Sequence, residues 1–168
     1  MFIGKNQKPY SISELEISNV LNNDELLSLY SMSELDTLYK KYFGNYKAMY
    51  PHILTKKIKL YDSSDEVNSF IIDGQKFWLD KATRVGLMHL ANCSIDDLQL
   101  VLGDKILTFP VEFAKDFLMR LEVYAGQCYL QTQKHLLAVK ELKTVEDILN
   151  YDYTTGYPEK ITLEWVVF

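Results

Sequence analysis

The sequence predicts an α+β protein built around one long helix, with two β-hairpins and a final strand beside it. Between residues 111 and 142, apolar side chains recur at alternating spacings of four and three, which is the period of one face of a helix. Strand-prone runs flank Asp73-Gly74-Gln75, and two more flank Gly103-Asp104; short turns of this composition are typical of hairpins. Residues 160–166 alternate polar and apolar side chains, as a strand does.

The first part of the chain is expected to form short helices after an extended arm. A helical pattern begins at Ser11, Asp24 can cap a second helix over residues 25–30, and Ser33 opens a third. The third helix either ends near Gly44 or continues to Tyr50, where Pro51 would stop it.

The pattern changes near residue 55, so we predict a helical docking arm over residues 1–54 and an α+β domain over residues 55–168. Residues 57–61 alternate polar and apolar side chains and are predicted to be a strand. The two hairpins follow, with strands over residues 69–72 and 76–79, and over 98–102 and 105–109. Between the hairpins, Asp80 can cap a helix over residues 81–91 whose inward side chains are predicted to be Val85, Leu87 and Met88.

The long helix is predicted over residues 111–142, but the sequence leaves open whether it is continuous through Gly126, because glycine weakens a helix interior. Gln131 and His135 interrupt its apolar face. Polar residues in such a seam can fix the register and subunit number of an oligomer; the alternative is that this end of the helix is exposed. The predicted face comprises Phe113, Phe117, Leu121, Tyr124, Cys128, Gln131, His135, Ala138 and Leu142, with a second stripe at Leu118, Ala125, Tyr129, Leu136 and Val139.

The end of the chain is predicted to add one more helix and the final strand. Thr144 can cap a short helix that runs to about Tyr151, with acidic residues in its first turn. The final strand then pairs either with a hairpin of the same chain or with a neighbouring subunit.

The composition argues against several classes of protein. The formal net charge of −5 disfavours binding to nucleic acid, which needs a basic surface. No apolar run approaches the roughly 20 residues of a membrane span, and residues 1–10 lack the apolar core of a signal peptide. Cys93 and Cys128 have no nearby cysteine partner and are expected to be buried thiols in a reducing compartment. We therefore expect a soluble protein made in a cytoplasm.

The sequence predicts no catalytic residue, cofactor or metal site. It contains no GxSxG elbow, P-loop or GxGxxG motif. His89 and Cys93 share one helix face, and Cys128 and His135 another, but a zinc site needs three or four convergent ligands. The acidic pairs at 96–97 and 146–147 are expected to be cap and turn residues rather than paired catalytic carboxylates.

Several separate motifs resemble one family. Trp78 stands just before an acid-lysine-x-threonine-arginine helix start, a Thr144-Val145-Glu146 cap follows the long middle helix, and the turn GYPEK at residues 156–160 closes the pattern. With the surrounding runs 60–87 and 142–163, they resemble a domain family of unknown function from tailed phages and prophages. Its members occur in tail-fibre-associated and tail-fibre-assembly proteins, including many from phages of gut Bacteroidales. The resemblance covers about two-thirds of the chain and excludes the residues before 55.

The resemblance implies a phage particle or its assembly line, with no catalytic residues to carry over. The first expectation is a non-enzymatic virion protein, made in the host cytoplasm, that acts as a tail or tail-fibre adaptor or decorates the particle. Its partners would be tail, fibre or portal-proximal proteins and further copies of itself, not nucleic acid or membrane. The alternatives are a tail-fibre assembly chaperone and, third, a small hydrolase-type enzyme. The predicted contact residues are Tyr30, Tyr39, Tyr42, Phe43, Tyr46, Tyr50, Gln131 and His135.

Overall fold

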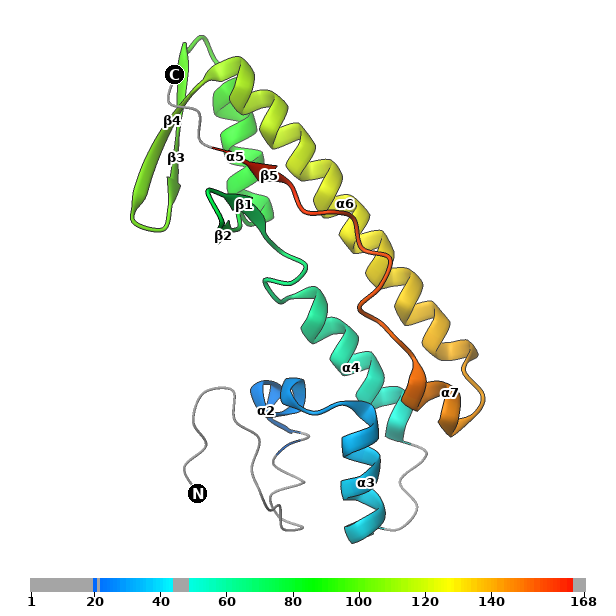
Figure 1. Ribbon diagram of the computed structural model, residues 1–168. Coiled ribbons are helices and arrows are strands. Elements are labelled where there is room, and N and C mark those ends of the chain that lie inside the picture. Colours follow the sequence, from blue (N-terminus) through cyan, green and yellow to red (C-terminus); the bar gives the residue numbers. More distant parts are fainter. Residues whose placement is uncertain (1–19, 21, 44–48, 165–168) are drawn as a thin grey trace. The chain divides into compact units, whose positions relative to one another are not determined.

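The computed structural model describes residues 20, 22–43 and 49–164, and it confirms the α+β class (Figure 1). The predicted arm over residues 1–9, the helix expected from Ser11 and Tyr46 lie outside the described residues. The described elements are α2 (Asp24–Leu29), α3 (Met32–Phe43), α4 (Tyr50–Asp62), β1 (Phe70–Ile72), β2 (Gln75–Phe77), α5 (Lys81–Ala91), β3 (Asp97–Leu102), β4 (Lys105–Pro110), α6 (Val111–Glu141), α7 (Val145–Asn150) and β5 (Thr162–Leu163).

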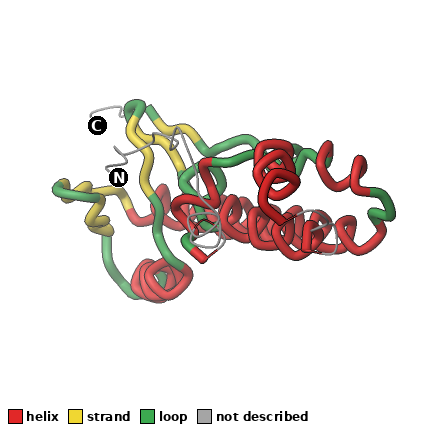
Figure 2. Tube along the Cα trace, turned by 90° about the horizontal axis from the view of Figure 1, so that it is seen from below, coloured by secondary structure: helices red, strands yellow, loops and turns green. Residues whose placement is uncertain are grey.

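The chain forms two compact units. The helical unit comprises the residues up to Ser63 together with Gln131–Thr155, and the sheet unit comprises Ser64–Leu130 with the residues from Gly156 onward. Every described element of the helical unit is a helix, whereas the sheet unit contains all the described strands together with helices. Figure 2 draws the helices in red and the strands in yellow. The units therefore divide the chain differently from the boundary predicted near residue 55, and α6 contributes a segment to each.

The helical unit is held by one apolar cluster and by capped helix ends. The side chain of Asn23 accepts a hydrogen bond from the backbone N–H of Leu26 at the start of α2, and Thr144 and Asp147 form a reciprocal capping box at the start of α7. The predicted start of α7 is thus confirmed. The buried cluster consists of Val20, Leu27, Tyr30, Met32, Leu35, Tyr50, Ile53, Leu54, Ile58, Val139 and Ile148.

The strand predicted over residues 57–61 is wrong, because these residues form the last turns of α4. Ile58 is fully buried, but so is Lys57, whose side chain lies on the inner face at 3% exposure. Its Nζ donates to the carbonyl oxygen of Leu27 at 2.9 Å and also to that of Tyr30. Because these are carbonyls at the end of α2, the buried ammonium group is satisfied there and the local alternation has no structural meaning.

The sequence left two ends open for the third helix, and the one near Gly44 is confirmed, because α3 ends at Phe43. The alternative that Pro51 stops this helix is wrong: Pro51 lies in the first turn of α4, which begins at Tyr50. Backbone N–H groups in the first turn have no partner within the helix, so a residue without an N–H group costs nothing there. Proline therefore marks the beginning of this helix rather than the end of the preceding one.

The first hairpin and the final strand form a three-stranded sheet in the order β2-β1-β5. Asp73 and Gly74 make the turn with φ values of 48° and 77°, the left-handed conformation that a two-residue hairpin turn requires. β5 pairs parallel to β1, with Ile71 opposite Thr162. The final strand therefore pairs with a hairpin of the same chain. Beneath β1, the ring of Phe70 meets that of Phe117 on α6 edge to face, with centroids 5.1 Å apart.

The second hairpin is confirmed, and its two faces differ sharply. Leu98, Leu100 and Leu102 of β3 are buried on one face. Val101 and Ile106, which are paired across the strands, are 67% and 65% exposed on the other. The hairpin therefore leaves an apolar pair exposed near its turn.

Helix α5 has the predicted bounds and the predicted Asp80 cap, but not the predicted inner face. Val85 is 43% exposed, whereas Arg84 is 5% exposed. The Arg84 guanidinium bonds to Glu122 at 2.7 Å and to the carbonyl oxygen of Leu79 at 2.6 Å, and its central carbon lies 5.0 Å from the centroid of a Trp78 ring. Because its guanidinium donors have partners and its charge lies over an aromatic ring, Arg84 can be buried. The neighbouring Val85 then lies on the exposed side of the helix.

Helix α6 is 31 residues long and continuous through Gly126, which settles the question left open by the sequence. Phe117, Leu121, Tyr124, Cys128 and His135 of the predicted face are buried. The second stripe is only partly buried: Leu118 and Val139 are buried, whereas Tyr129 is 60% exposed. The helix is thus covered along one face and exposes large apolar side chains elsewhere.

Replacing Gly126 with alanine is expected to raise the free energy of unfolding by about 0.5–1 kcal/mol, because alanine favours the helix and a Cβ at this position would meet nothing within 4 Å. Gly74→Ala should instead lower it by roughly 1–2 kcal/mol, because φ at Gly74 is +77°. Urea unfolding of both variants measures the two changes. A destabilising Gly126→Ala substitution would contradict a continuous, exposed helix at this point.

Candidate protein-binding surface

Two of the tyrosines predicted to contact partners lie instead in the core of the helical unit. Tyr30 and Tyr50 are 5% and 2% exposed, and the Tyr50 hydroxyl lies 2.5 Å from a carboxylate oxygen of Asp36, to which it donates. These two side chains therefore stabilise the chain's own fold. Tyr39, Tyr42 and Phe43 are in α3, their side chains lie outside the described part, and their contact role stays a prediction.

Gln131 and His135 bind a loop of their own chain. His135 is 5% exposed; its Nδ1 lies 2.7 Å from the Tyr151 hydroxyl, and its Nε2 lies 2.9 Å from the carbonyl oxygen of Thr155. The Gln131 amide donates to the same carbonyl at 3.1 Å. A carbonyl only accepts, so the His135 tautomer with its hydrogen on Nε2 donates to Thr155 and accepts from Tyr151 at Nδ1. The other tautomer donates from Nδ1 to Tyr151 and accepts at Nε2 from the Gln131 amide nitrogen, which lies 3.0 Å away. Burial raises the pKa of Tyr151 above its ordinary value, which keeps its hydroxyl protonated.

This network holds residues 151–155 against α6 within the helical unit. The sequence showed that two polar residues interrupt an apolar stripe, but not that the loop after α7 supplies their partners. A role for Gln131 and His135 in oligomer register stays a prediction.

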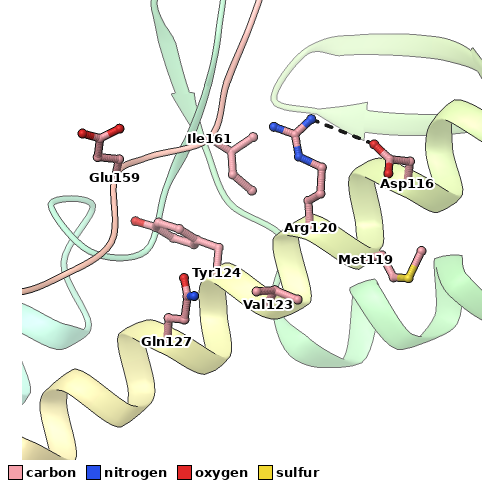
Figure 3. A pocket seen from close by; sticks show the side chains of 8 residues that line it. All are labelled: Asp116, Met119, Arg120, Val123, Tyr124, Gln127, Glu159 and Ile161. Carbon is pink, nitrogen blue, oxygen red and sulfur yellow. Dashed lines mark ion pairs between the residues drawn. The ribbon is translucent and has the colours of Figure 1, made fainter.

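The sheet unit contains an open groove of about 420 Å³ beside α6. One wall is α6, and the other is the segment that leads into β5 (Figure 3). Met119 and Val123 on the α6 side are 58% and 60% exposed. The groove is lined by Asp116, Met119, Arg120, Val123, Tyr124, Gln127, Glu159 and Ile161.

Charged side chains lie beside the apolar part of this groove. Asp116 and Arg120 form an ion pair at 3.9 Å, with both side chains more than half exposed, and Glu159 lies on the opposite wall. Apolar centres with a polar rim are typical of surfaces that bind other proteins.

The apolar surface continues along α6 past the groove. Met119, Val123 and Leu130 are spaced by four and seven residues, so they lie on one face, and Leu130 is 58% exposed. Gly126 lies on the same face and has no side chain. We call Met119, Val123, Gly126 and Leu130 the α6 face. Among the described residues it exposes three large apolar side chains in a row.

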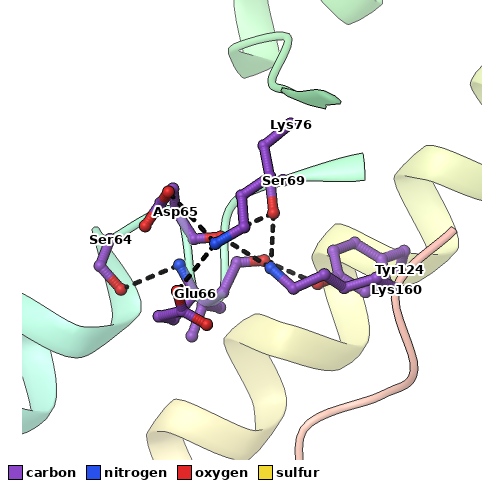
Figure 4. Close-up of polar contacts among 8 residues, drawn as sticks. Ser64, Asp65, Glu66, Ser69, Lys76, Tyr124 and Lys160 are labelled. Carbon is purple, nitrogen blue, oxygen red and sulfur yellow. Dashed lines mark hydrogen bonds and ion pairs between the residues drawn. The ribbon is translucent and has the colours of Figure 1, made fainter. Parts of the chain in front are cut away.

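A polar cluster in the sheet unit places a serine beside a lysine, as in enzymes that use serine as the nucleophile and lysine as its base. The serine, however, is not accessible to a substrate. The Lys160 amine donates to the Ser69 hydroxyl at 2.5 Å, and burial lowers the pKa of Lys160 (Figure 4). Lysine amines of lowered pKa can activate serine nucleophiles. However, Ser69 is 1% exposed and donates its own hydrogen to the Asp65 carbonyl oxygen at 2.6 Å. The cluster therefore ties the loop after α4 to the segment before β5.

Other predicted sites can be placed as well. Cys128 is buried as predicted, but Cys93 is exposed, so the prediction that both are buried is wrong for the cysteine that follows α5. Over residues 20, 22–43 and 49–164, no three histidine, cysteine, aspartate or glutamate side chains are grouped to hold a metal ion. No helix in the same ranges is long and apolar enough to span a bilayer.

The Lys160 contacts can be tested by substitution. Lys160→Met is expected to lower the free energy of unfolding by about 1–3 kcal/mol, because the buried Ser69 hydroxyl loses its donor and the Asp65 carbonyl keeps only the donor from Ser69. Lys76→Met is the matched control: Lys76 pairs with Asp65 and Glu66 at the surface, where ion pairs contribute little. Urea unfolding at neutral pH compares them, and equal losses would contradict the special role of Lys160.

Comparison with known proteins assigns no family to this geometry, because no protein-family model, curated protein or solved structure matches the chain. The candidate surface accordingly rests on the residues of α6 and of the segment across the groove.

Proposed function

We propose that the chain is a non-enzymatic structural protein of a phage particle, a tail or tail-fibre adaptor or a decorating component, that assembles by binding other proteins. The observation that carries the binding role is the exposed α6 face beside the groove. The phage assignment is supported by the resemblance of residues 60–87 and 142–163 to tail-fibre-associated domains.

The α6 face offers a partner apolar contact along roughly three turns of helix. Covering a side chain such as Val123 or Leu130 stabilises a complex by about 1.5–3 kcal/mol when it becomes fully buried. Gly126 lies between them, so a partner side chain or backbone can approach the helix closely at this point. Tyr129, also 60% exposed, borders the face with a large side chain that suits an interface.

The charged residues of the groove would select the orientation in which a partner binds. Asp116 and Arg120 lie at one side and Glu159 at the other, so a bound segment can pair its own charges with both walls. Charges at a rim mainly select the partner and its orientation, whereas the apolar centre provides most of the affinity. The surface is therefore suited to an apolar helix or strand with charged flanks.

The groove can be disabled without altering the core. Val123→Glu places a carboxylate at the centre of the α6 face, where a partner would bury it unpaired. Incorporation into particles should fall at least about tenfold, since 1.4 kcal/mol already corresponds to that factor. Val85→Glu on α5 is the matched control, because Val85 is an exposed helical valine outside the groove. Quantitative mass spectrometry of particles purified from the host that carries the gene gives the copy number, and circular dichroism checks the fold. Unchanged incorporation of Val123→Glu would contradict the proposed surface.

The same measurement on the unmodified protein separates the two phage roles. A constant number of copies per particle is expected for a structural component. Absence from mature particles, with the protein present in the cells that produce them, would overturn that role in favour of a tail-fibre assembly chaperone.

A further inference from the structure

The α6 face has the same spacing when it is followed in either direction along the helix. Its positions 119, 123, 126 and 130 are separated by four, three and four residues. When a second α6 packs against it in the antiparallel direction, Met119 therefore lies opposite Leu130 of the other copy. Val123 lies opposite Gly126 in the same arrangement, so the space above the glycine receives a valine. The face is thus complementary to itself, as the interface of a two-fold dimer must be.

A parallel arrangement of two α6 helices fits this face less well. Each position would then lie opposite its own copy, and the paired Gly126 residues would leave a gap in the contact. With the α6 face as the seam, Lys115 and Arg120 take the flanking positions that meet in a parallel pair, where their like charges repel. In the antiparallel pair, Arg120 lies opposite Gln127 instead, whose amide oxygen can accept from it. Packing and charge therefore both favour the antiparallel direction.

The polar residues at the two edges of the α6 face also match in the antiparallel direction. Lys134 is exposed one turn beyond Leu130 on α6, and it lies opposite Asp116 of the other copy, whose side chain is 64% exposed. At the other edge, Tyr129 lies opposite Glu122, so its hydroxyl can donate to that carboxylate. Two-fold symmetry makes each of these contacts twice. Charge complementarity of this kind selects the partner and its direction.

We propose that the α6 face binds a second copy of this chain, with the two α6 helices antiparallel about a two-fold axis. The inference rests on the proposed function, because it names a second copy as a partner of the same surface. Met119 and Val123, which line the groove, would be covered by the other copy, and release of water from these side chains would favour the contact. The dimer would be the form that enters the particle.

Sedimentation equilibrium of the full chain tests the dimer. We expect a reversible dimer whose dissociation constant rises at least about tenfold in Val123→Glu, because the other copy would bury the carboxylate unpaired. Val85→Glu on α5, which is likewise an exposed helical valine, is the matched control and should leave the constant unchanged. A monomer at every concentration, or an assembly that both variants weaken equally or that neither weakens, would overturn the proposal.

Cross-linking through introduced cysteines determines the direction of the two helices. Chains carrying Met119→Cys are mixed with chains carrying Leu130→Cys, both in a Cys93→Ser background that removes the exposed native thiol, and the mixture is mildly oxidised. Because the two positions lie opposite each other in the antiparallel pair, disulfides are expected between the two variants and not within either variant alone. Disulfides only between identical positions would overturn the proposal in favour of a parallel pair, and the absence of any disulfide would overturn it as well.

Incorporation into particles separates the failure of this inference from the failure of the proposed function. A monomeric chain whose incorporation still falls in Val123→Glu would overturn the dimer and leave the α6 face as the surface for a different protein. An antiparallel dimer that is absent from mature particles would support the inference and overturn the structural role in the particle.

Discussion

The burial of one face of α6 is the constraint on which both units depend. A helix of 31 residues gains its stability in water mainly from packing of an apolar face, not from helix propensity. In the sheet unit, Phe117 meets Phe70 of β1, and the Tyr124 hydroxyl donates to the Val67 carbonyl oxygen at 2.7 Å. In the helical unit, Val139 joins the core cluster with residues of α2 to α4 and α7. The apolar face of α6 is therefore buried by several short elements, each of which packs against a different part of the helix.

The fold also depends on buried polar side chains that form hydrogen bonds with other groups of the protein. Lys57 binds carbonyls at the end of α2, Arg84 binds Glu122 and the Leu79 carbonyl, and His135 binds Tyr151 and Thr155. Burial of such groups is costly unless their donors are used, and each of these meets a partner far away in the sequence. These contacts connect loops and helix ends to the packed elements. Because hydrogen bonds are directional, they fix the positions of these segments more closely than apolar contacts alone would.

What could be predicted from the sequence was local. The Asp73-Gly74 turn, the Asp80 and Thr144 caps and the period of α6 each depend on residues within a few positions of one another, and all are confirmed. The errors at residues 57–61 and at Val85 have one cause: the pattern assumed that lysine and arginine point outward. Lys57 and Arg84 point inward because distant carbonyls and Glu122 accept their hydrogen bonds. The candidate surface was likewise out of reach, since the sequence shows that α6 has apolar residues on several sides but not which side the chain itself covers.

One side of α6 is buried by the rest of the chain and another side exposes apolar residues, and this exposed side is the basis of the proposed binding role. Where the chain offers a nucleophile beside an amine, at Ser69 and Lys160, it closes the pair away from solvent and uses it to hold two segments together. Where it offers an open concavity, between α6 and the segment before β5, the accessible side chains include Met119 and Val123, which bind by shape and release of water and cannot transfer a proton or an acyl group. At Ser69 and Lys160, the reactive groups therefore lack the access that a catalytic site needs. A contact surface needs access and apolar area at the same place, and α6 provides both. The uncovered side of α6 is therefore the feature of the fold that supports the proposed binding role.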